Sequence, residues 1–257
     1  MDLGLGGQAV LLAGASRGIG LAAARAFAAE GCRIALVARD AARLEEAARQ
    51  VCAGSPPDVL PLPGDATRSG DAARIVRGTL DRFGRIDALV NLVGGSRGHP
   101  GIEAPDGDWD AVLASNLRAA ITMTRLVVPS MQERRSGVIV NVASIFGREW
   151  GGAASYNAAK AALIAYSKSC SRELAPHGIR VNSVAPGSIF FPGGSWDRRR
   201  QADPGAIDDF VKRELPLGRF GTPEEVAAAI LFLASKPASL LIGVCLNVDG
   251  GQSRSLF

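Results

Sequence analysis

The sequence is poor in the residues that build metal centres and disulfide frameworks. Its 257 residues include only two histidines and four cysteines, and no two cysteines stand in a C-x-x-C spacing. Zinc sites and disulfide scaffolds need such residues close together in the chain. The sequence therefore predicts no metal site, and we expect the cysteines to be free, buried thiols.

Runs of like charge and long apolar runs are also scarce. Residues 198–200 are the only run of three basic residues, so the net charge of +4 and the pI of about 9.1 do not indicate a nucleic-acid surface. No apolar stretch reaches the roughly 18 residues that span a bilayer, and the first residues lack the basic start of a secretory signal. We expect a cytoplasmic protein that binds neither nucleic acid nor a membrane.

Short apolar runs alternate with helical patterns along the chain. Strands are predicted at 8–13, 32–38, 59–63, 86–93, 137–144, 178–185 and 243–248, and helices at 19–30, 41–53, 71–83, 108–134, 155–175 and 223–234. Repeated strand and helix give a parallel sheet, and strands apolar on both sides need helices on both faces. The prediction is an α/β protein: one Rossmann domain over residues 1–257, with a doubly wound, seven-stranded parallel sheet.

One connection breaks this alternation. Residues 187–217 contain several glycines and prolines, the adjacent Phe190 and Phe191, and Trp196. Long irregular connections inside compact domains are usually lids or binding loops. We therefore expect an irregular substrate lid at about 188–217.

A glycine-rich turn follows the first predicted strand. Gly14, Gly18 and Gly20 have the spacing G-x-x-x-G-x-G and lead directly into the first predicted helix. Glycines there permit a tight turn and let a helix N-terminus approach a pyrophosphate. The turn predicts a nucleotide site, although similar turns also occur simply to join a strand to a helix.

The same stretch also fits the G-x-S-x-G nucleophile elbow of hydrolases, through Ser16. That alternative needs a histidine that follows an acid late in the chain, and His177 is the one late candidate. His177 lies at a predicted helix end, where a capping role is more ordinary. The hydrolase interpretation predicts that Ser16 is essential and that Tyr156 is dispensable.

Two arginines indicate which dinucleotide binds. Arg39 ends the second predicted strand, where an acidic residue would accept the adenosine ribose hydroxyls and repel a 2′-phosphate. Arg17, in the glycine turn, can approach the same phosphate from the other side. The pair predicts NADP(H) and disfavours NAD(H), and the alternative is two solvated surface arginines.

Tyr156 and Lys160 stand four residues apart in an alanine-rich segment, residues 155–169, that has no glycine or proline. Such a segment is helical, and residues four apart share a helix face. A cation beside a phenol lowers the phenol's pKa, which suits a group that exchanges a proton with an alkoxide. Taken singly, a core tyrosine and a surface lysine are the ordinary alternatives.

In their order and spacing these residues resemble the short-chain dehydrogenase/reductase family, and within it the reductases similar to 3-oxoacyl-acyl-carrier-protein reductase. Besides the glycine turn, the resemblance includes Asp65, "NLVG" from Asn91, Asn116, Ser144 twelve residues before Tyr156, and "VDGG" near the end. It covers almost the whole chain. It implies an NADPH-dependent ketoreductase or alcohol dehydrogenase, in which hydride passes between the nicotinamide and a ketone or secondary alcohol.

The resemblance also implies a role for each matching residue. Tyr156 would exchange the proton, Lys160 would assist it and hold the nicotinamide ribose, Ser144 would bind the substrate oxygen, and Asn116 would support a water-linked proton path. The residues expected to bind the cofactor are Gly14, Ser16, Arg17, Gly18, Ile19, Gly20, Arg39, Asp65, Ala66, Asn91, Val93, Gly94, Tyr156, Lys160, Pro186, Gly187, Ser188 and Ile189.

The chain departs from the family's pattern at three places. Ala13 replaces a threonine of the glycine motif, and Leu92 and Val93 change the usual "NNAG" to "NLVG". Ser188 stands near the place where a threonine commonly holds the nicotinamide carboxamide. We expect the hydrogen bonds that brace the cofactor loops to be missing or replaced, and the carboxamide to be held by Ser188 or by the backbone alone.

Aromatic residues of the lid and of the segment before Tyr156 predict an apolar pocket for a hydrophobic or aromatic ketone. A 3-oxoacyl ketone and a hydrophobic cyclic ketone are the two candidates. The residues expected to bind the substrate are Ser144, Trp150, Tyr156, Phe190, Phe191 and Trp196. Packing of the lid onto the body explains the lid aromatics equally well. A homotetramer, or a homodimer, is implied by the resemblance alone.

One alternative belongs to a different functional class. A protein that binds NADP without turnover, as a sensor or an assembly partner, would need the glycine turn but not the catalytic group. The presence of Ser144, Tyr156 and Lys160 together argues against it.

Overall fold

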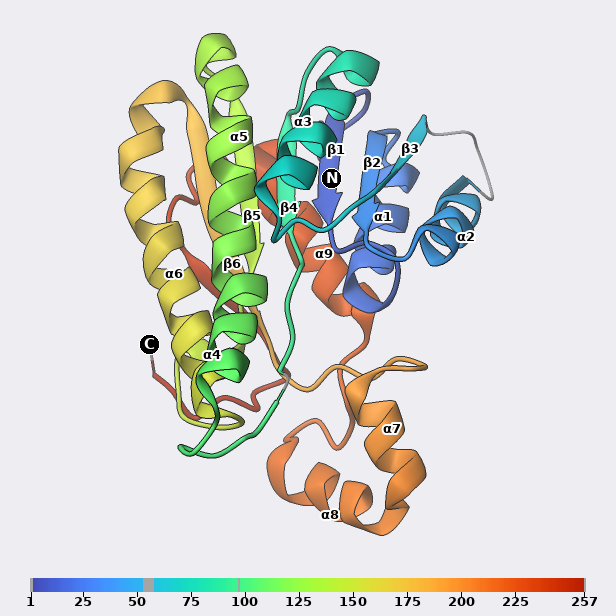
Figure 1. The fold of residues 1–257 in the computed structure, drawn as a ribbon, viewed down its shortest axis with the longest axis vertical. Helices are drawn as coiled ribbons and strands as arrows, with labels where there is room; N and C mark the ends of the chain where they lie inside the picture. The colour runs from blue at the N-terminus through green and yellow to red at the C-terminus, as the bar shows by residue number, and fades with distance from the viewer. Residues whose placement is uncertain (1, 53–57, 97, 257) are drawn as a thin grey trace.

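A seven-stranded sheet runs through the middle of the molecule (Figure 1). The computed structural model describes residues 2–52, 58–96 and 98–256. The strands are β1 Ala9–Ala13, β2 Arg33–Ala38, β3 Val59–Pro63, β4 Ala88–Asn91, β5 Gly137–Val142, β6 Ile179–Pro186 and β7 Cys245–Val248. They are all parallel and lie in the order β3-β2-β1-β4-β5-β6-β7. The predicted fold class is confirmed.

The strand order reverses at β1, with β2 and β3 on one side and β4 to β7 on the other. Loops that follow β1 and β4 therefore leave the sheet in opposite directions and open a crevice at its carboxyl edge. The register aligns the strand ends there, because Ala13 pairs with Val37 and with Asn91. Every loop that follows a strand lies at this edge.

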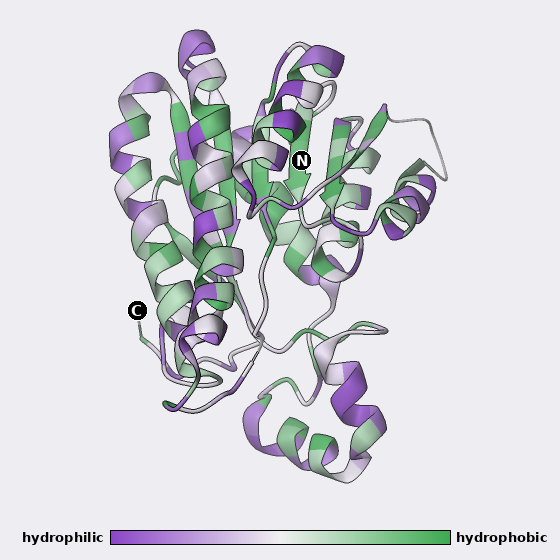
Figure 2. Cartoon of the chain, in the orientation of Figure 1, coloured by the Kyte–Doolittle hydropathy of each residue, from purple (hydrophilic) through white to green (hydrophobic). Residues whose placement is uncertain are grey.

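Helices cover both faces of the sheet and bury two apolar clusters against it. One face carries α1 Gly18–Ala29, α2 Ala41–Cys52 and α9 Pro223–Ala234. The other carries α3 Ser69–Phe83, α5 Ala119–Arg134 and α6 Ala154–Leu174. Neighbouring strand residues such as Leu11 and Leu12 are both fully buried but belong to opposite clusters. This is why the strands read as continuous apolar runs, drawn green in Figure 2.

The helix expected at 108–134 is not uniform. It consists of α4 Asp106–Leu113, a five-residue π turn at Ala114–Arg118, and α5. By length and composition alone this helix could cross a membrane. It packs instead on α3, α6, β4 and β5, which is the position of a core helix in a soluble protein.

The lid was wrongly expected to be irregular. It holds two helices, α7 Ser195–Ala202 and α8 Pro204–Glu214, which stand apart from the sheet in Figure 1. Asp203 separates them and caps α8 by accepting the Ala206 N–H at 3.0 Å. Helix α7 buries no residue and is strongly hydrophilic in Figure 2, so its sequence has no apolar periodicity to reveal it.

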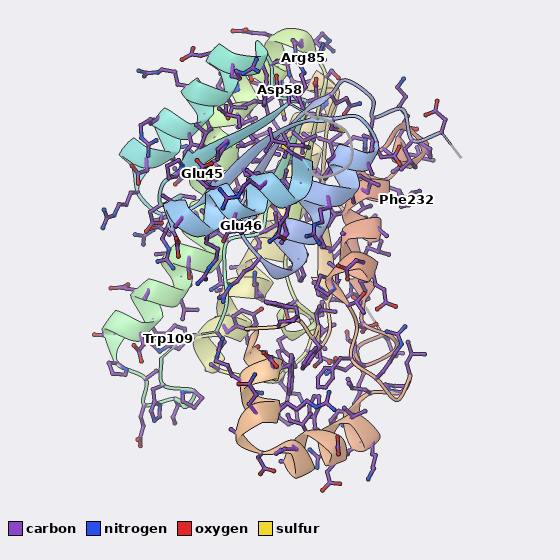
Figure 3. All side chains as sticks on the ribbon, turned by 90° about the vertical axis from the view of Figure 1, so that its right-hand side faces the viewer. Glu45, Glu46, Asp58, Arg85, Trp109 and Phe232 are labelled. Carbon is purple, nitrogen blue, oxygen red and sulfur yellow. The ribbon has the colours of Figure 1, made fainter. Side chains whose placement is uncertain are left out.

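The remaining differences from expectation are small. The last residue of the helix expected at 41–53 lies outside the described residues. Cys32 is buried and Cys170 and Cys245 partly so, but Cys52 is exposed, so its expected burial is wrong. Beside Cys52 on α2, Glu45 and Glu46 point to solvent (Figure 3), and Glu46 pairs with Arg49 at 2.6 Å.

Gly20 lies where strand β1 and helix α1 leave no room for a side chain. A Cβ there would overlap the Gly14 carbonyl oxygen and lie 2.8 Å from Ala15 Cα. Because these are backbone atoms, we expect Gly20→Ala to lower the free energy of unfolding by about 1–3 kcal/mol in urea titrations. Gly70→Ala is the matched control: nothing lies within 4 Å of its Cβ, and helix propensity should raise stability by about 0.5–1 kcal/mol. Equal stability of the two variants would contradict this packing.

Candidate active site

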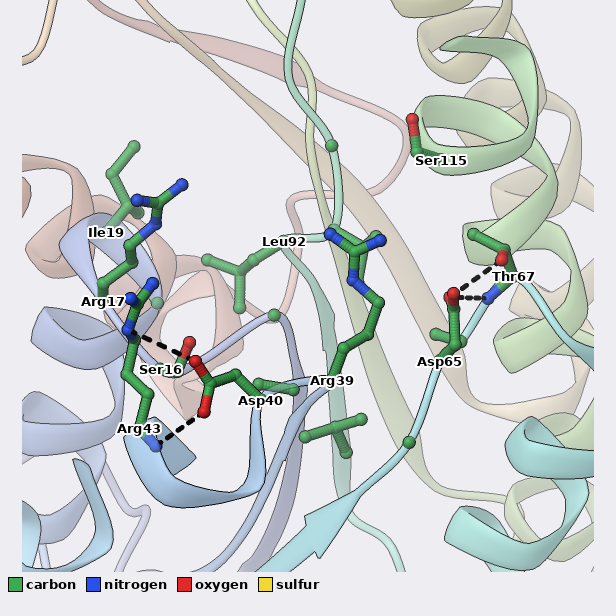
Figure 4. Close-up of a pocket in the computed structure, with 18 of the residues that line it drawn as sticks. Ser16, Arg17, Ile19, Arg39, Asp40, Arg43, Asp65, Thr67, Leu92 and Ser115 are labelled. Atoms are coloured by element: carbon green, nitrogen blue, oxygen red, sulfur yellow. Dashed lines mark hydrogen bonds and ion pairs between the residues drawn. The ribbon is translucent and has the colours of Figure 1, made fainter. Parts of the chain in front are cut away.

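A cleft of about 750 Å³ opens at the carboxyl edge where β1, β2 and β4 end (Figure 4). That volume lies within the range of pockets that enclose small ligands and cofactors. Many residues expected to bind the cofactor line it: Gly14, Ser16, Arg17, Ile19, Gly20, Arg39, Asp65, Ala66, Val93 and Gly94.

At the floor of this cleft, the glycine turn and the loop after β4 bring their backbones close together. Gly14 has φ of +99°, and a Cβ there would lie 2.9 Å from both Leu92 C and Val93 N. The Leu92 N–H also donates to the Ala13 carbonyl at 2.8 Å. The loop after β4 is therefore braced on the glycine turn by backbone contacts, which need neither the threonine nor the second asparagine of the family's pattern.

The N-terminus of α1 faces the cleft. Arg17, the N-cap residue, makes no side-chain cap to the first turn of α1, which starts at Gly18. The first N–H groups of a helix have no partner within it, and together with the helix dipole they suit a phosphate. The turn therefore fits the pyrophosphate of a dinucleotide.

Three arginines border the cleft in Figure 4: Arg17 from the glycine turn, Arg39 from the end of β2, and Arg43 from the first turn of α2. Asp40 caps α2 by accepting the Arg43 N–H at 3.0 Å, and its carboxylate lies 3.8 Å from Arg43 Nε. Asp65, also in the cleft, accepts the N–H and hydroxyl of Thr67. This cationic border suits the 2′-phosphate of NADP. Sequence reasoning did not name Arg43, although it stands only four residues after Arg39.

Phe191 lies in this cleft rather than in a separate substrate pocket. A Cβ on Gly18, which has φ of +53°, would be 2.7 Å from Phe191 Cζ, so the ring packs directly on the glycine turn. Arg17 reaches the same part of the lid and donates to the Gly193 carbonyl at 3.3 Å. The lid therefore contacts the nucleotide site.

Ser144, Tyr156 and Lys160 come together beyond the ends of β4 and β5. Tyr156 and Lys160 share one face of α6, and Lys160 Nζ lies 5.6 Å from the centre of the Tyr156 ring. Ser144, just past β5, accepts the Phe146 N–H at 3.2 Å and is hydrogen-bonded to the Tyr156 phenol. Because the backbone amide already donates to Ser144 Oγ, the hydroxyl proton is left to donate to the phenol.

Burial sets the protonation of this group. Lys160 is 3% exposed, its Nζ donates to the Val142 carbonyl at 2.7 Å, and burial lowers its pKa to about 7. Burial raises the pKa of Tyr156, and the bond from Ser144 only opposes this. The expected lowering of the Tyr156 pKa by Lys160 together with an oxidised nicotinamide stays a prediction. An amine with a pKa of about 7 is only partly charged near neutrality, so desolvation of the phenolate outweighs its attraction.

Asn116 occupies the π turn, a feature that often marks functional positions. Its side chain accepts the Gly95 N–H at 2.9 Å and donates to the carbonyls of Gly95 and Val112, each at 3.0 Å. A Cβ on the neighbouring Gly94 would be 3.2 Å from Lys160 Nζ. Asn116 thus fastens the loop after β4 against Lys160, and its expected part in a water-linked proton path stays a prediction.

Not every expected cofactor residue lines the cleft. Asn91, in β4, donates to Asn141 Oδ1 at 2.8 Å and so binds the neighbouring strand. The segment 186–189 follows β6 at the same edge, where Ile189 bridges to Gly221. The backbone N–H and the hydroxyl of Ser188 are both bonded to Gln252, and the Ser188 carbonyl accepts the Gly221 N–H. Sequence reasoning missed Gln252, which is 64 residues away in the chain.

The residues expected to bind substrate do not form one pocket. Trp196 packs on Phe210 and Phe220, with ring centres 4.4 Å and 5.1 Å apart, and Phe190 packs on Phe220 at 5.8 Å. Trp150 is 91% exposed. Phe190 and Trp196 thus build the core of the lid, as the alternative interpretation holds, and contact of these residues with a substrate stays a prediction.

The topology does not support the hydrolase interpretation. Ser16 follows the carboxyl end of β1, whereas His177 lies in the short helix Ala175–His177 that precedes β6. Because the strands are parallel, the two residues lie at opposite edges of the sheet.

Comparison with known proteins finds relatives along almost the whole chain. A family model described as enoyl-(acyl carrier protein) reductase matches residues 14–253. The chain is 38% identical over 250 residues to 3-oxoacyl-[acyl-carrier-protein] reductase FabG of Thermotoga maritima, which covers 96% of this chain and 98% of the relative. It is 36% identical over 247 residues to 3-oxoacyl-[acyl-carrier-protein] reductase of Synechocystis, covering 95% and 96%.

Solved structures match over the whole fold. L-sorbose reductase from Gluconobacter frateurii, complexed with NADPH and L-sorbose, superposes with a TM-score of 0.93 at 34% identity, over 100% of both chains. Levodione reductase superposes with a TM-score of 0.89 at 32% identity, over 96% of this chain and 97% of that one.

Lys160 should make stability depend on pH. Its pKa is about 7 in the folded protein and about 10.4 in an unfolded chain, so between these values the unfolded chain holds more protons and stability rises with pH. Lys160→Met removes this effect. From pH 7 to pH 9 the wild type should gain about 2 kcal/mol of unfolding free energy relative to this variant. Lys168→Met, which removes an exposed lysine from the same helix, is the control. If the unfolding free energy of the wild type does not rise relative to that of Lys160→Met between pH 7 and pH 9, the burial of the Lys160 amine is contradicted.

Proposed function

The chain belongs to the short-chain dehydrogenase/reductase family, and on that premise we propose that it is an NADPH-dependent ketoreductase. That it is an oxidoreductase acting on keto or hydroxyl groups follows from its relatives. One observation carries the proposal of a ketoreductase: Ser144 is hydrogen-bonded to Tyr156, and Tyr156 lies one helical turn before the buried Lys160. A cleft bordered by three arginines lies at the same sheet edge.

The nicotinamide, when bound, supplies the hydride, and this chain's residues handle the oxygen and the proton. When a ketone binds, the Ser144 hydroxyl turns its one proton from the Tyr156 phenol to the ketone oxygen, where negative charge develops. Tyr156 protonates that oxygen. The phenol is protonated at neutral pH, and burial raises its pKa further, so in the protein alone it holds the proton that reduction requires.

Lys160 has the right pKa to return that proton. With a pKa of about 7, its amine exchanges protons readily near neutrality, close to the Tyr156 ring. Its bond to the Val142 carbonyl fixes the nitrogen in place. Asn116 holds the loop that shields this nitrogen on its other side.

The relatives support two classes of ketone. Two are named as 3-oxoacyl-[acyl-carrier-protein] reductases, whereas one solved structure holds L-sorbose and another is a levodione reductase.

We extend the proposal to a cytoplasmic homotetramer or homodimer. The exposed Leu240, Ile242 and Leu246, on and before the edge strand β7, support this because a second copy would cover them.

Turnover should depend on Tyr156. We expect NADPH oxidation, followed at 340 nm, with at least one member of a panel of acetoacetyl thioester, L-sorbose and cyclic diketones. Tyr156→Phe removes the proton donor and should lower kcat by about 10²–10⁴-fold. Tyr166→Phe changes the chain's other tyrosine, which lies outside the site, and should leave kcat within twofold. NADPH binding without turnover of any ketone would favour a cofactor-binding sensor instead.

The arginine border should select NADPH over NADH. Removal of Arg39 or of Arg43 deletes a charged partner of the 2′-phosphate, so we expect each alanine variant to raise the KM for NADPH about tenfold. The KM for NADH should change less than twofold. Arg49→Ala, on the same helix as Arg43 but not among the residues that line the cleft, is the control for a general loss of positive charge. An equal rise for both cofactors would contradict recognition of the phosphate.

A further inference from the structure

Residues 249–255, here called the strap, follow β7 and are fixed beside the end of β6. The Asp249 carboxylate closes a turn within the strap by accepting the Ser253 N–H at 2.9 Å. Gln252 Oε1 accepts the Ser188 N–H at 2.7 Å. The strap is therefore attached to the body of the protein before its last residues begin.

One carboxylate oxygen binds those last residues. Glu149 Oε2 accepts the N–H groups of Arg254 at 2.7 Å and Ser255 at 2.9 Å. It also accepts the Ser253 hydroxyl at 3.1 Å. Hydrogen bonds to a carboxylate are stronger than those to a neutral acceptor. Arg254 also pairs with Glu214 of the lid at 3.1 Å, but its side chain is 76% exposed, and such pairs contribute little.

The backbone of Glu149 lies between the two side chains of the proposed reaction. Its N–H donates to the carbonyl of Ile145, the residue after Ser144, at 3.1 Å. Its carbonyl accepts the side-chain N–H of Asn157, the residue after Tyr156, at 2.8 Å. One residue thus links the turn after β5 to the first turn of α6.

The loop between these two turns depends on anchors outside it. Gly151 and Gly152 have φ of +151° and +76°, and glycine has the least restricted backbone of all residues. The same loop carries the Phe146 N–H, which holds the catalytic serine hydroxyl at 3.2 Å. Arg148 supplies one anchor by donating to the Cys245 carbonyl at 2.7 Å, and the carboxylate of the next residue supplies the other.

We propose that Glu149 is a positioning residue. Its carboxylate, held by the strap, fixes the backbone that links the Ser144 turn to the start of α6, and so it sets how the Ser144 hydroxyl meets the Tyr156 phenol. The inference rests on the proposed function, because it assigns this meeting of two side chains to catalysis. Glu149 acts through these two residues and needs no contact with ketone or cofactor.

The test compares Glu149→Ala with Glu149→Gln. Glutamine keeps the size of the side chain and one acceptor oxygen for the strap, whereas alanine keeps neither. The kcat is measured at saturating NADPH with a ketone of the panel above that the wild type reduces. Glu103→Ala, which removes an exposed loop carboxylate elsewhere, is the control for the lost charge.

We expect Glu149→Ala to lower kcat about three- to tenfold, because catalysis is sensitive to small displacements of reacting groups, and to leave the KM for NADPH within twofold. Glu149→Gln should keep kcat within twofold of wild type. In the Ser144→Ala background, Glu149→Ala should lower kcat less than twofold, because the contact that it positions is absent. An undiminished loss in that background, an equal loss for Glu149→Gln, or no loss for Glu149→Ala would overturn the role of Glu149.

Amide hydrogen exchange reads the same attachment without turnover. The N–H groups of residues 146–149 are all hydrogen-bonded, so a peptide that covers 145–150 should exchange about tenfold faster in Glu149→Ala than in wild type. Unchanged exchange would show that the strap does not hold this loop, and the role of Glu149 would be overturned. If Glu149→Ala does not fold, a chain that ends at Gln252 and so lacks the three donors is measured by both methods, with the same criteria.

The proposed function fails in a different place. If the wild type reduces no ketone of the panel, the proposed function falls, and the positioning role of Glu149 falls with it. If the wild type reduces a ketone and Glu149→Ala keeps its kcat, only the role of Glu149 is overturned.

Discussion

The site depends on how α6 is fixed to β5. Lys160 is buried in this interface and donates to the Val142 carbonyl, the last residue of the strand. Seven residues further along the helix, Ser167 accepts a bond from Asn141 at 2.8 Å. These two contacts set both the rotation and the height of α6 on the sheet, and so they bring Tyr156 to Ser144.

The same burial that positions Lys160 also decides the chemistry of the pair. A charged amine would stabilise tyrosinate, but the interior disfavours both charges and moves the two pKa values in opposite directions. The neutral phenol with a readily exchanged amine is then the resting form. A neutral phenol can still give its proton to an alkoxide, which is a much stronger base than a phenolate, and this agrees with the proposed reduction of a ketone.

Features that depend on local spacing could be predicted from the sequence. Features that depend on contacts between distant parts of the chain could not. The alternating apolar runs predicted the sheet, and the four-residue spacing placed Tyr156 beside Lys160. The direction of the Tyr156 pKa shift could not be predicted, because it depends on how deeply the packed structure buries the phenol. Helix α7 was missed because a helix that buries nothing has no periodic apolar face. The bond of Gln252 to Ser188 joins residues 64 positions apart, and no local pattern marks it.

Ser144 and Ser188 share one feature: the hydroxyl oxygen of each accepts a hydrogen bond from an N–H group. In each, a fixed N–H donates to the hydroxyl oxygen: the Phe146 backbone in one case and the Gln252 amide in the other. A serine hydroxyl has one proton and two acceptor lone pairs, so an N–H that occupies one lone pair restricts the directions in which the proton can point. At Ser144 the proton then faces the Tyr156 phenol. The proposed ketone oxygen would take that proton as its partner on binding, which is why the position of Ser144 relative to Tyr156 matters more to the proposed reaction than the exposure of either side chain.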